Sequence, residues 1–252
     1  MWHLTATIPL TAPPSWAVWE RIDNLRQAET YDWREVVSFH NKENCGHEQP
    51  WACFLAGDKP TYPEEILSAS YQGMCQRLAL IRADDEVDQG EMRNVHRWQA
   101  TNPVTSEALV QLTLGAPQPI YNGGLLIADV RYFDADRRRL GLPADVSALV
   151  DKVEAHGIRV RLINLHGDKV RHLVIQAGAM AQHRFSEARY SVRTSDYPGR
   201  SVTYCEPELT VEWDTAAIDS KHLKIDLPPD SEITINLGLK RFVDNPSYSH
   251  PL

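Results

Sequence analysis

The chain has 252 residues, which is enough for one large domain or two small ones. Hydrophobic residues make up 42% and charged residues 24%, the ordinary balance of a globular protein with a real core. The net charge of -8 excludes a general nucleic-acid binder, because such a protein needs a basic face to displace counterions from phosphates.

The N-terminal residues MWHLTATIPLTAPP have no basic region and no long apolar run, so they are not typical of a signal peptide. No stretch approaches the roughly 20 apolar residues that a membrane-spanning helix needs. Four cysteines are present without a CxxC pair, although His47 lies between two of them: Cys45, Cys53, Cys75 and Cys205. Zinc sites usually have closer ligand pairs. We therefore expect a cytoplasmic protein with reduced cysteines, no membrane partner, no metal and no other cofactor.

Helical patterns dominate the first half of the chain. Ser15 is a candidate N-cap for a helix that ends near Glu29. The sequence TYPE, residues 61–64, has the form of a capping box, and apolar residues then recur at helical spacing, which predicts a buried stripe: Leu67, Tyr71, Met74, Leu78 and Ile81. Asn102-Pro103 predicts the start of a further helix that ends at Gly115.

The polar segment from His40 to Trp51 is predicted to be a loop with candidate functional residues. Histidine transfers protons near neutral pH, and a carboxylate acts as acid or base or orients an imidazole. Asparagine can exchange hydrogen bonds with hydroxyls, and the flat face of tryptophan can stack on a sugar ring. The candidates are His40, Asn41, Glu43, His47, Glu48 and Trp51. The alternative is a polar surface loop with a purely structural role.

A second cluster, VHRWQATN, contains His96 and Trp98, whose residue types also suit hydroxyl recognition. Asn102 is already explained as a helix cap. Tyr62 lies at the start of the second predicted helix and is a candidate proton donor.

After residue 116 the pattern becomes β. Residues 149–178 predict three strands joined by two tight turns, because apolar and polar residues alternate with a period of two and Gly157 and Gly167 fall between them. Further strands are expected at 125–133, 184–192, 202–205, 209–213, 222–226 and 232–237. The run Arg137-Arg138-Arg139 favours a solvated surface, with an anionic ligand as the alternative.

The fold class that follows is α+β, with a short α-rich N-terminal part followed by an antiparallel β-sandwich. We place the α-rich segment at 1–116 and the sandwich at 117–252.

Several stretches carry a resemblance to a known group: PPSWAVWER near the start, then VRLINL, VIQAG, HRF and LPPDSEITINLGLKRFVDNPSY. They resemble the C-terminal β-sandwich of (α/α)-toroid carbohydrate-active proteins, the six-hairpin glycosidase and heparinase-like lyase group. A complete toroid needs several hundred helical residues, whereas about 100 precede the sandwich here, so the resemblance implies a shortened member. It implies no individual catalytic residue.

The resemblance implies a glycoside hydrolase or polysaccharide lyase relative with a carbohydrate ligand. In a lyase, His40 or His47 would remove the proton beside a uronate carboxylate and Tyr62 would protonate the leaving oxygen. In a hydrolase, Glu43 and Glu48 would be the carboxylate pair. The first alternative is a non-catalytic carbohydrate-binding or scaffold protein. The second is a homo-oligomer in which a partner subunit covers an apolar face that the few helices leave exposed.

Overall fold

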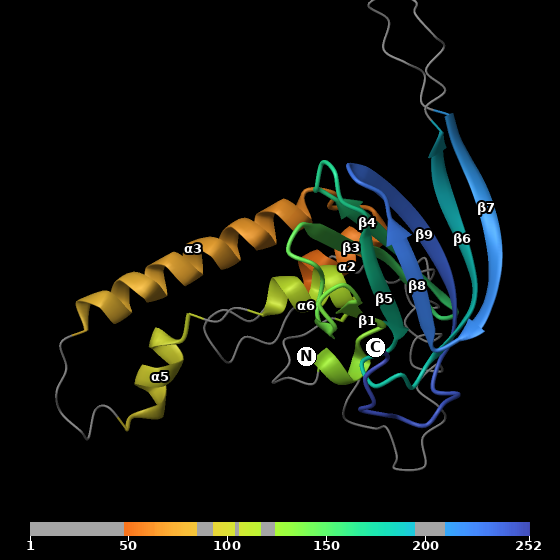
Figure 1. Ribbon diagram of the computed structural model, residues 1–252. Helices are drawn as coiled ribbons and strands as arrows, with labels where there is room; N and C mark the ends of the chain where they lie inside the picture. The colour runs from red at the N-terminus through yellow and green to blue at the C-terminus, as the bar shows by residue number, and fades with distance from the viewer. Residues whose placement is uncertain (1–47, 85–92, 104–105, 117–123, 195–209) are drawn as a thin grey trace, which may run out of the picture.

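A computed structural model describes residues 48–84, 93–103, 106–116, 124–194 and 210–252. The fold is α+β: helices in the N-terminal part precede two antiparallel sheets that pack as a sandwich, as the sequence predicts (Figure 1). The predicted helix at 15–29, most of the 40–51 segment and the predicted strand at 202–205 lie outside the described residues.

The described helices are α2 (Glu48–Ala56), α3 (Tyr62–Ala83), α5 (Val95–Thr101) and α6 (Glu107–Leu114), followed by the 3-10 turn η3 (Gly124–Ile127). The predicted helix after Thr61 is confirmed as α3, although the Thr61 side chain does not cap the backbone and instead donates to Glu65 at 2.7 Å. Gly115 ends α6 with a φ of +68°, the left-handed conformation that favours glycine. α5 was not predicted, because its seven residues are too few to show a clear period.

The first sheet has the strand order β2-β1-β5-β8 and the second has the order β3-β4-β9-β6-β7. The strands of the first sheet are β1 (Val130–Asp134), β2 (Arg139–Leu140), β5 (Arg171–Ala177) and β8 (His222–Leu227). Those of the second are β3 (Val146–Glu154), β4 (Gly157–Asn164), β6 (Arg184–Thr194), β7 (Thr210–Ser220) and β9 (Ser231–Lys240).

The main core lies between the two sheets. The alternation in β4 buries Ile158, Val160 and Leu162 while the residues between them are half-buried, as the period of two predicts. These side chains pack with Leu173 and Ile175 of the opposite sheet. Truncating a fully buried leucine such as Leu162 to alanine would cost about 2–5 kcal/mol of stability.

The predicted hairpin turn at Gly167 is instead a crossing between the two sheets. β4 pairs with β3 and β9, whereas β5 pairs with β1 and β8, so residues 165–170 carry the chain from one sheet to the other. Residues 228–230 carry it back from β8 to β9 in the same way. Gly167 is not among the glycines with positive φ, because this connection is longer than a tight hairpin turn and does not require it.

The helices cover the β3 side of the second sheet. α2, α3 and α6 contribute Trp51, Tyr62 and Leu112 to a smaller buried cluster, against which Leu149 of β3 packs. Beyond its first turns, α3 extends away from the sandwich (Figure 1). Only Tyr62 and Ile66 of α3 are buried, so most of its predicted apolar stripe is not part of the core.

A buried ion pair joins the start of β1 to the end of β9. Arg241 donates to Asp129 and also to the carbonyls of Ala155 and Glu154, at 3.0 and 2.8 Å. Both charged side chains are fully inaccessible, and burial raises the pKa of Asp129 to about 6 against the opposing effect of Arg241. Breaking such a pair from one side leaves an uncompensated buried charge, which typically costs 3–5 kcal/mol.

No helix within the described ranges is both long enough and apolar enough to cross a bilayer.

Candidate functional site

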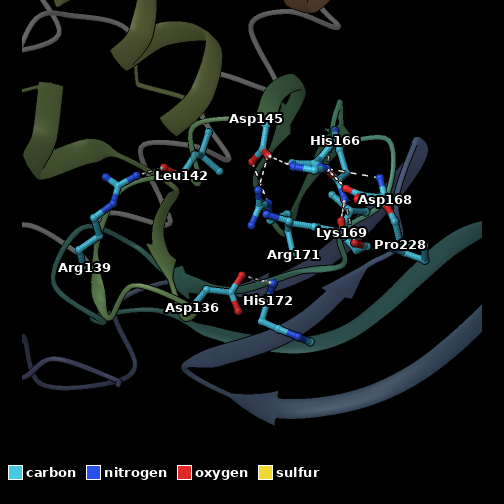
Figure 2. A network of polar contacts seen from close by, with 12 residues as sticks. Asp136, Arg139, Leu142, Asp145, His166, Asp168, Lys169, Arg171, His172 and Pro228 are labelled. Carbon is cyan, nitrogen blue, oxygen red and sulfur yellow. Dashed lines mark hydrogen bonds and ion pairs between the residues drawn. The ribbon is translucent and has the colours of Figure 1, made fainter.

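A polar pocket opens at one end of the sandwich. Its walls come from the turn between β1 and β2, the segment before β3, and the crossing from β4 to β5 (Figure 2). The cavity measures about 270 Å³. It is lined by Asp134, Asp136, Arg137, Pro143, Ala144, Asp145, His166, Lys169 and Arg171.

The strongest interaction in the pocket wall is the pair between Asp145 and Arg171. Arg171 donates from Nε to one carboxylate oxygen at 2.9 Å and from Nη2 to the other, which is the bidentate geometry of a strong charge-assisted pair (Figure 2). The hydrogen bond from Arg171 holds the pKa of Asp145 below its usual value, and the pKa of Arg171 is raised correspondingly. Asp145 is therefore ionised near neutral pH.

Two further aspartates order the turn between β1 and β2. The buried Asp134 accepts from the backbone N–H of Arg137 at 3.1 Å and lies 3.3 Å from Nε of Arg139. Asp136 accepts from the backbone N–H of His172 at 3.3 Å, which joins the turn to β5. The acidic side chains of the pocket thus already have hydrogen-bond donors within the protein.

His166 lies beside Asp145, on the crossing from β4 to β5 (Figure 2). Its Nε2 is 4.0 Å from Asp145, and its Nδ1 is 2.8 Å from a carboxylate oxygen of Asp168. Its backbone N–H donates at 3.0 Å to Asn164, the fully buried last residue of β4. Asn164 in turn donates to the carbonyl of Lys169 at 2.8 Å, so the same amide positions both His166 and Lys169.

Two cations at the pocket are exposed and have no side-chain hydrogen bond or ion pair with any residue in the described ranges: Arg137 and Lys169. Arg171, the third cation of the lining, is paired with Asp145. The lining has three carboxylates and three cations, so its formal charges balance, but Arg137 and Lys169 are not held by an acidic side chain within the described residues. An anionic group with several oxygens suits such a site.

Asp145 is not suited to act as a general acid in the pocket. A general acid must hold a proton near the working pH, but Asp145 is stabilised in its ionised form by Arg171. No group of three or more histidine, cysteine or acidic side chains suited to a metal ion occurs among the described residues.

Most of the functional residues predicted from the sequence lie away from the pocket or outside the described part of the chain. His40, Asn41, Glu43 and His47 precede residue 48, and the side chains of Glu48 in α2 and His96 in α5 are not described. For these residues the predicted roles remain predictions.

The described candidates are spread over the helices. Tyr62 is only 1% exposed and its hydroxyl donates to Gln111, and Trp51 is also buried, so both pack in the cluster beneath α3. Trp98 is 66% exposed on α5. The structure brings none of these three to the sandwich pocket.

The sequence predicts only one part of the pocket. The arginine run at 137–139 was considered for an anionic ligand, and Arg137 does line the pocket. Asp145, His166 and Lys169 were missed because they come together only when β4 crosses to the other sheet, which no local pattern reveals.

Comparisons with known proteins give one match. A family model described as a domain of unknown function, DUF8034, matches residues 17–110. The matched part contains α2, α3, α5 and the start of α6, and all the described strands lie after it. No curated protein and no solved structure matches the chain.

Proposed function

We propose that this protein binds an acidic saccharide, such as a uronate-bearing oligosaccharide, in the polar pocket of its sandwich, without chemistry at that pocket. The observation that carries this proposal is the pair of exposed cations, Arg137 and Lys169, beside the fixed Asp145–Arg171 pair. The resemblance of the sandwich sequences to carbohydrate-active proteins agrees with a saccharide.

The size and polarity of the pocket support a small, oxygen-rich ligand. At about 270 Å³ it lies below the roughly 300–1,000 Å³ of pockets for drug-sized molecules, so it suits a single sugar unit. Its lining offers carboxylate acceptors and guanidinium donors at fixed positions, which suit the hydroxyls of a sugar ring. The exposed Lys169 ammonium is the donor for the carboxylate of the ligand.

The catalytic hypothesis draws no support from the pocket. Its acidic side chains are engaged, and Tyr62 is buried against Gln111 rather than placed beside a ligand. Hydrolysis or elimination stays a prediction about His40, Glu43, His47 and Glu48. The same samples that measure binding can test it.

The test uses a uronate oligosaccharide and its carboxyl-reduced, neutral counterpart as matched ligands, with affinity measured by titration calorimetry. We expect the acidic ligand to bind and the neutral one to bind at least tenfold more weakly. Lys169→Gln should weaken acidic binding about tenfold, the effect of one charge-assisted hydrogen bond. Lys240→Gln is the matched control, because Lys240 is exposed at the far end of β9 from the pocket.

Equal affinity for the two ligands, or an equal loss in the two lysine variants, would refute the acidic-saccharide proposal. Reducing ends and unsaturated products are assayed in the same mixtures. Turnover that persists in Lys169→Gln would indicate that the active residues are instead those predicted from the sequence before α2: His40, Glu43 and His47.

A further inference from the structure

α3 presents an apolar stripe that is largely exposed within the described part of the chain. Tyr71 is 64% exposed, Leu67 45% and Ile81 41%, and Met74 and Leu78 between them are only half-buried. The sequence pattern predicts these five residues to be core, but α3 projects from the sandwich (Figure 1), and only Tyr62 and Ile66 of this helix are buried. Exposed apolar surface of this kind marks an interaction site.

The spacing of the stripe identifies the kind of partner. Its members are separated by four, three, four and three residues, which is the a/d repeat of a coiled-coil seam and not the broader face of a helix that packs on a sheet. The natural partner of such a seam is another helix with the same repeat.

The charges of α3 make it complementary to an antiparallel copy of itself. Glu64 and Glu65 lie in its first turn, and Arg82 lies in its last. A second α3 running in the opposite direction places the basic end of each helix beside the acidic end of the other. A parallel copy would instead place like charges together.

We propose that the protein forms a two-fold homodimer through α3, with the two copies of the stripe packed as an antiparallel helix pair. In this arrangement Leu67 packs on Leu78 of the second copy, and Tyr71 packs on Met74 of the second copy. Each contact occurs twice, as the symmetry of an isologous interface requires. Arg82 lies beside Glu64 of the second copy.

The size of the seam sets the strength of the dimer. From Leu67 to Ile81 the stripe runs about 21 Å along the helix axis. A seam of this length on one helix buries less surface than a standard interface of about 800 Å² per partner, so we expect a weak dimer and choose micromolar concentrations for the test.

The first experiment is sedimentation equilibrium of the full chain over a range of micromolar concentrations. Wild type should fit a monomer–dimer equilibrium. Tyr71→Glu should weaken the dimer at least tenfold, because it puts a charge in the middle of the seam. Gln76→Glu is the control, because position 76 lies on the opposite side of α3 and receives the same charge. Circular dichroism of each variant confirms that the helix content is unchanged.

The second experiment fixes the orientation by disulfide formation. Leu67→Cys and Leu78→Cys variants are made with Cys45, Cys75 and Cys205 changed to serine. A mixture of the two variants should oxidise to a cross-linked heterodimer, and neither variant alone should do so. An antiparallel pair predicts this result, since residue 67 of one copy meets residue 78 of the other and neither residue meets its own counterpart.

A wild-type monomer at every concentration would overturn the proposal, and so would equal effects of the two glutamate variants. Cross-linking of Leu67→Cys with itself would overturn the antiparallel arrangement. None of these measurements uses the pocket, so the dimer and the saccharide proposal can fail separately.

Discussion

His183 is a buried histidine whose environment makes its neutral form part of the folded state. Its side chain is 1% exposed, its Nδ1 accepts the backbone N–H of Phe242 at 2.9 Å, and the Phe242 ring packs edge-on at 4.3 Å between centroids. Burial, with a smaller effect of Arg241, lowers the pKa of His183 to about 3. A protonated ring could not accept this hydrogen bond.

This depressed pKa predicts acid sensitivity. In the unfolded chain the histidine titrates near 6.5, so the unfolded state binds a proton that the folded state rejects as the pH falls from 6.5 toward 3. The stabilisation is fully present above pH 6.5 and is lost below it, by up to about 1.4 kcal/mol per pH unit. His183→Gln keeps an acceptor without a titrating group, so its free energy of unfolding should fall about 2–3 kcal/mol less between pH 6.5 and 4.5.

Urea unfolding at a series of pH values measures this difference. His172→Gln serves as the control, because His172 is exposed on β5 and its pKa is raised by the hydrogen bond with Asp226. Replacing His172 should not reduce the fall in the free energy of unfolding at low pH. If the free energy of unfolding falls equally with pH in wild type and in His183→Gln, the prediction is wrong.

Two buried tyrosines should respond oppositely to removal of their hydroxyl groups. The hydroxyl of Tyr132 is buried in the main core without a hydrogen-bond partner among the described residues, and burial raises the pKa of Tyr132 above its usual value. Tyr132→Phe should therefore leave stability unchanged or raise it by up to about 1 kcal/mol. Tyr62→Phe should cost about 1–2 kcal/mol, since its hydroxyl donates to Gln111. A similar loss in both variants, measured by urea unfolding, would mean that Tyr132 has a partner such as a buried water.

At the scale of elements, the sequence predicts strands better than it predicts their partners. The period of two in β4 identifies its buried face correctly, because alternation is a local property of the strand. Whether the chain turns back after β4 or crosses to the other sheet depends on the pairing of β4 with β9 and of β5 with β8, and these partner strands are distant in the sequence. The pocket depends on that crossing, so its residues could not be found from spacing.

The same limit applies to the helices. The repeat from Leu67 to Ile81 predicts α3 correctly, but a repeat shows only that a face is apolar and not which surface covers it. Trp51 and Tyr62 were nominated for ligand contact by residue type, and the fold uses both as core. An aromatic side chain next to polar residues in sequence does not reveal its burial.

Asn164 is the side chain that holds the two sheet crossings together. Its Nδ2 lies 2.8 Å from the carbonyl of Lys169, and 3.1 and 2.9 Å from those of Leu227 and Pro228 at the end of β8. Asn164→Ala should cost about 3 kcal/mol, because buried carbonyl groups lose their donor. It should also weaken binding of the acidic saccharide, because Lys169 is no longer held.

Urea unfolding and calorimetric titration of Asn164→Ala test the two effects. Asn164→Asp has the same shape but replaces the donor with an acceptor, so it should be as destabilising as alanine at neutral pH. Asn236→Ala is the control in the neighbouring strand β9, where the asparagine is half-buried, and it should cost less than about 1 kcal/mol. An equal cost for positions 164 and 236 would show that the crossings are held by something else.

The two proposed binding surfaces, the polar pocket and the α3 stripe, lie on different parts of the molecule. The pocket lies at one end of the sandwich, and the α3 stripe lies on a helix that extends away from it (Figure 1). No element is shared, since α3 contributes nothing to the pocket lining and the pocket strands contribute nothing to the stripe. Substitutions at the two surfaces should therefore act independently on a single binding event.

A dimer with two distant pockets should nevertheless bind a long polysaccharide more tightly than a monomer does. When one pocket is occupied, the second pocket meets further units of the same polymer at a high effective concentration. Tyr71→Glu should therefore leave the affinity for a short uronate oligosaccharide within about twofold, while it weakens retention on an immobilised uronate polymer by about tenfold or more. Lys169→Gln should weaken both. Calorimetry with the oligosaccharide and surface binding to the polymer, at the same protein concentration, separate the two effects. A loss of oligosaccharide affinity in Tyr71→Glu would show that α3 acts on the pocket itself, and unchanged retention on the polymer would show that the two pockets of a dimer do not engage one chain together.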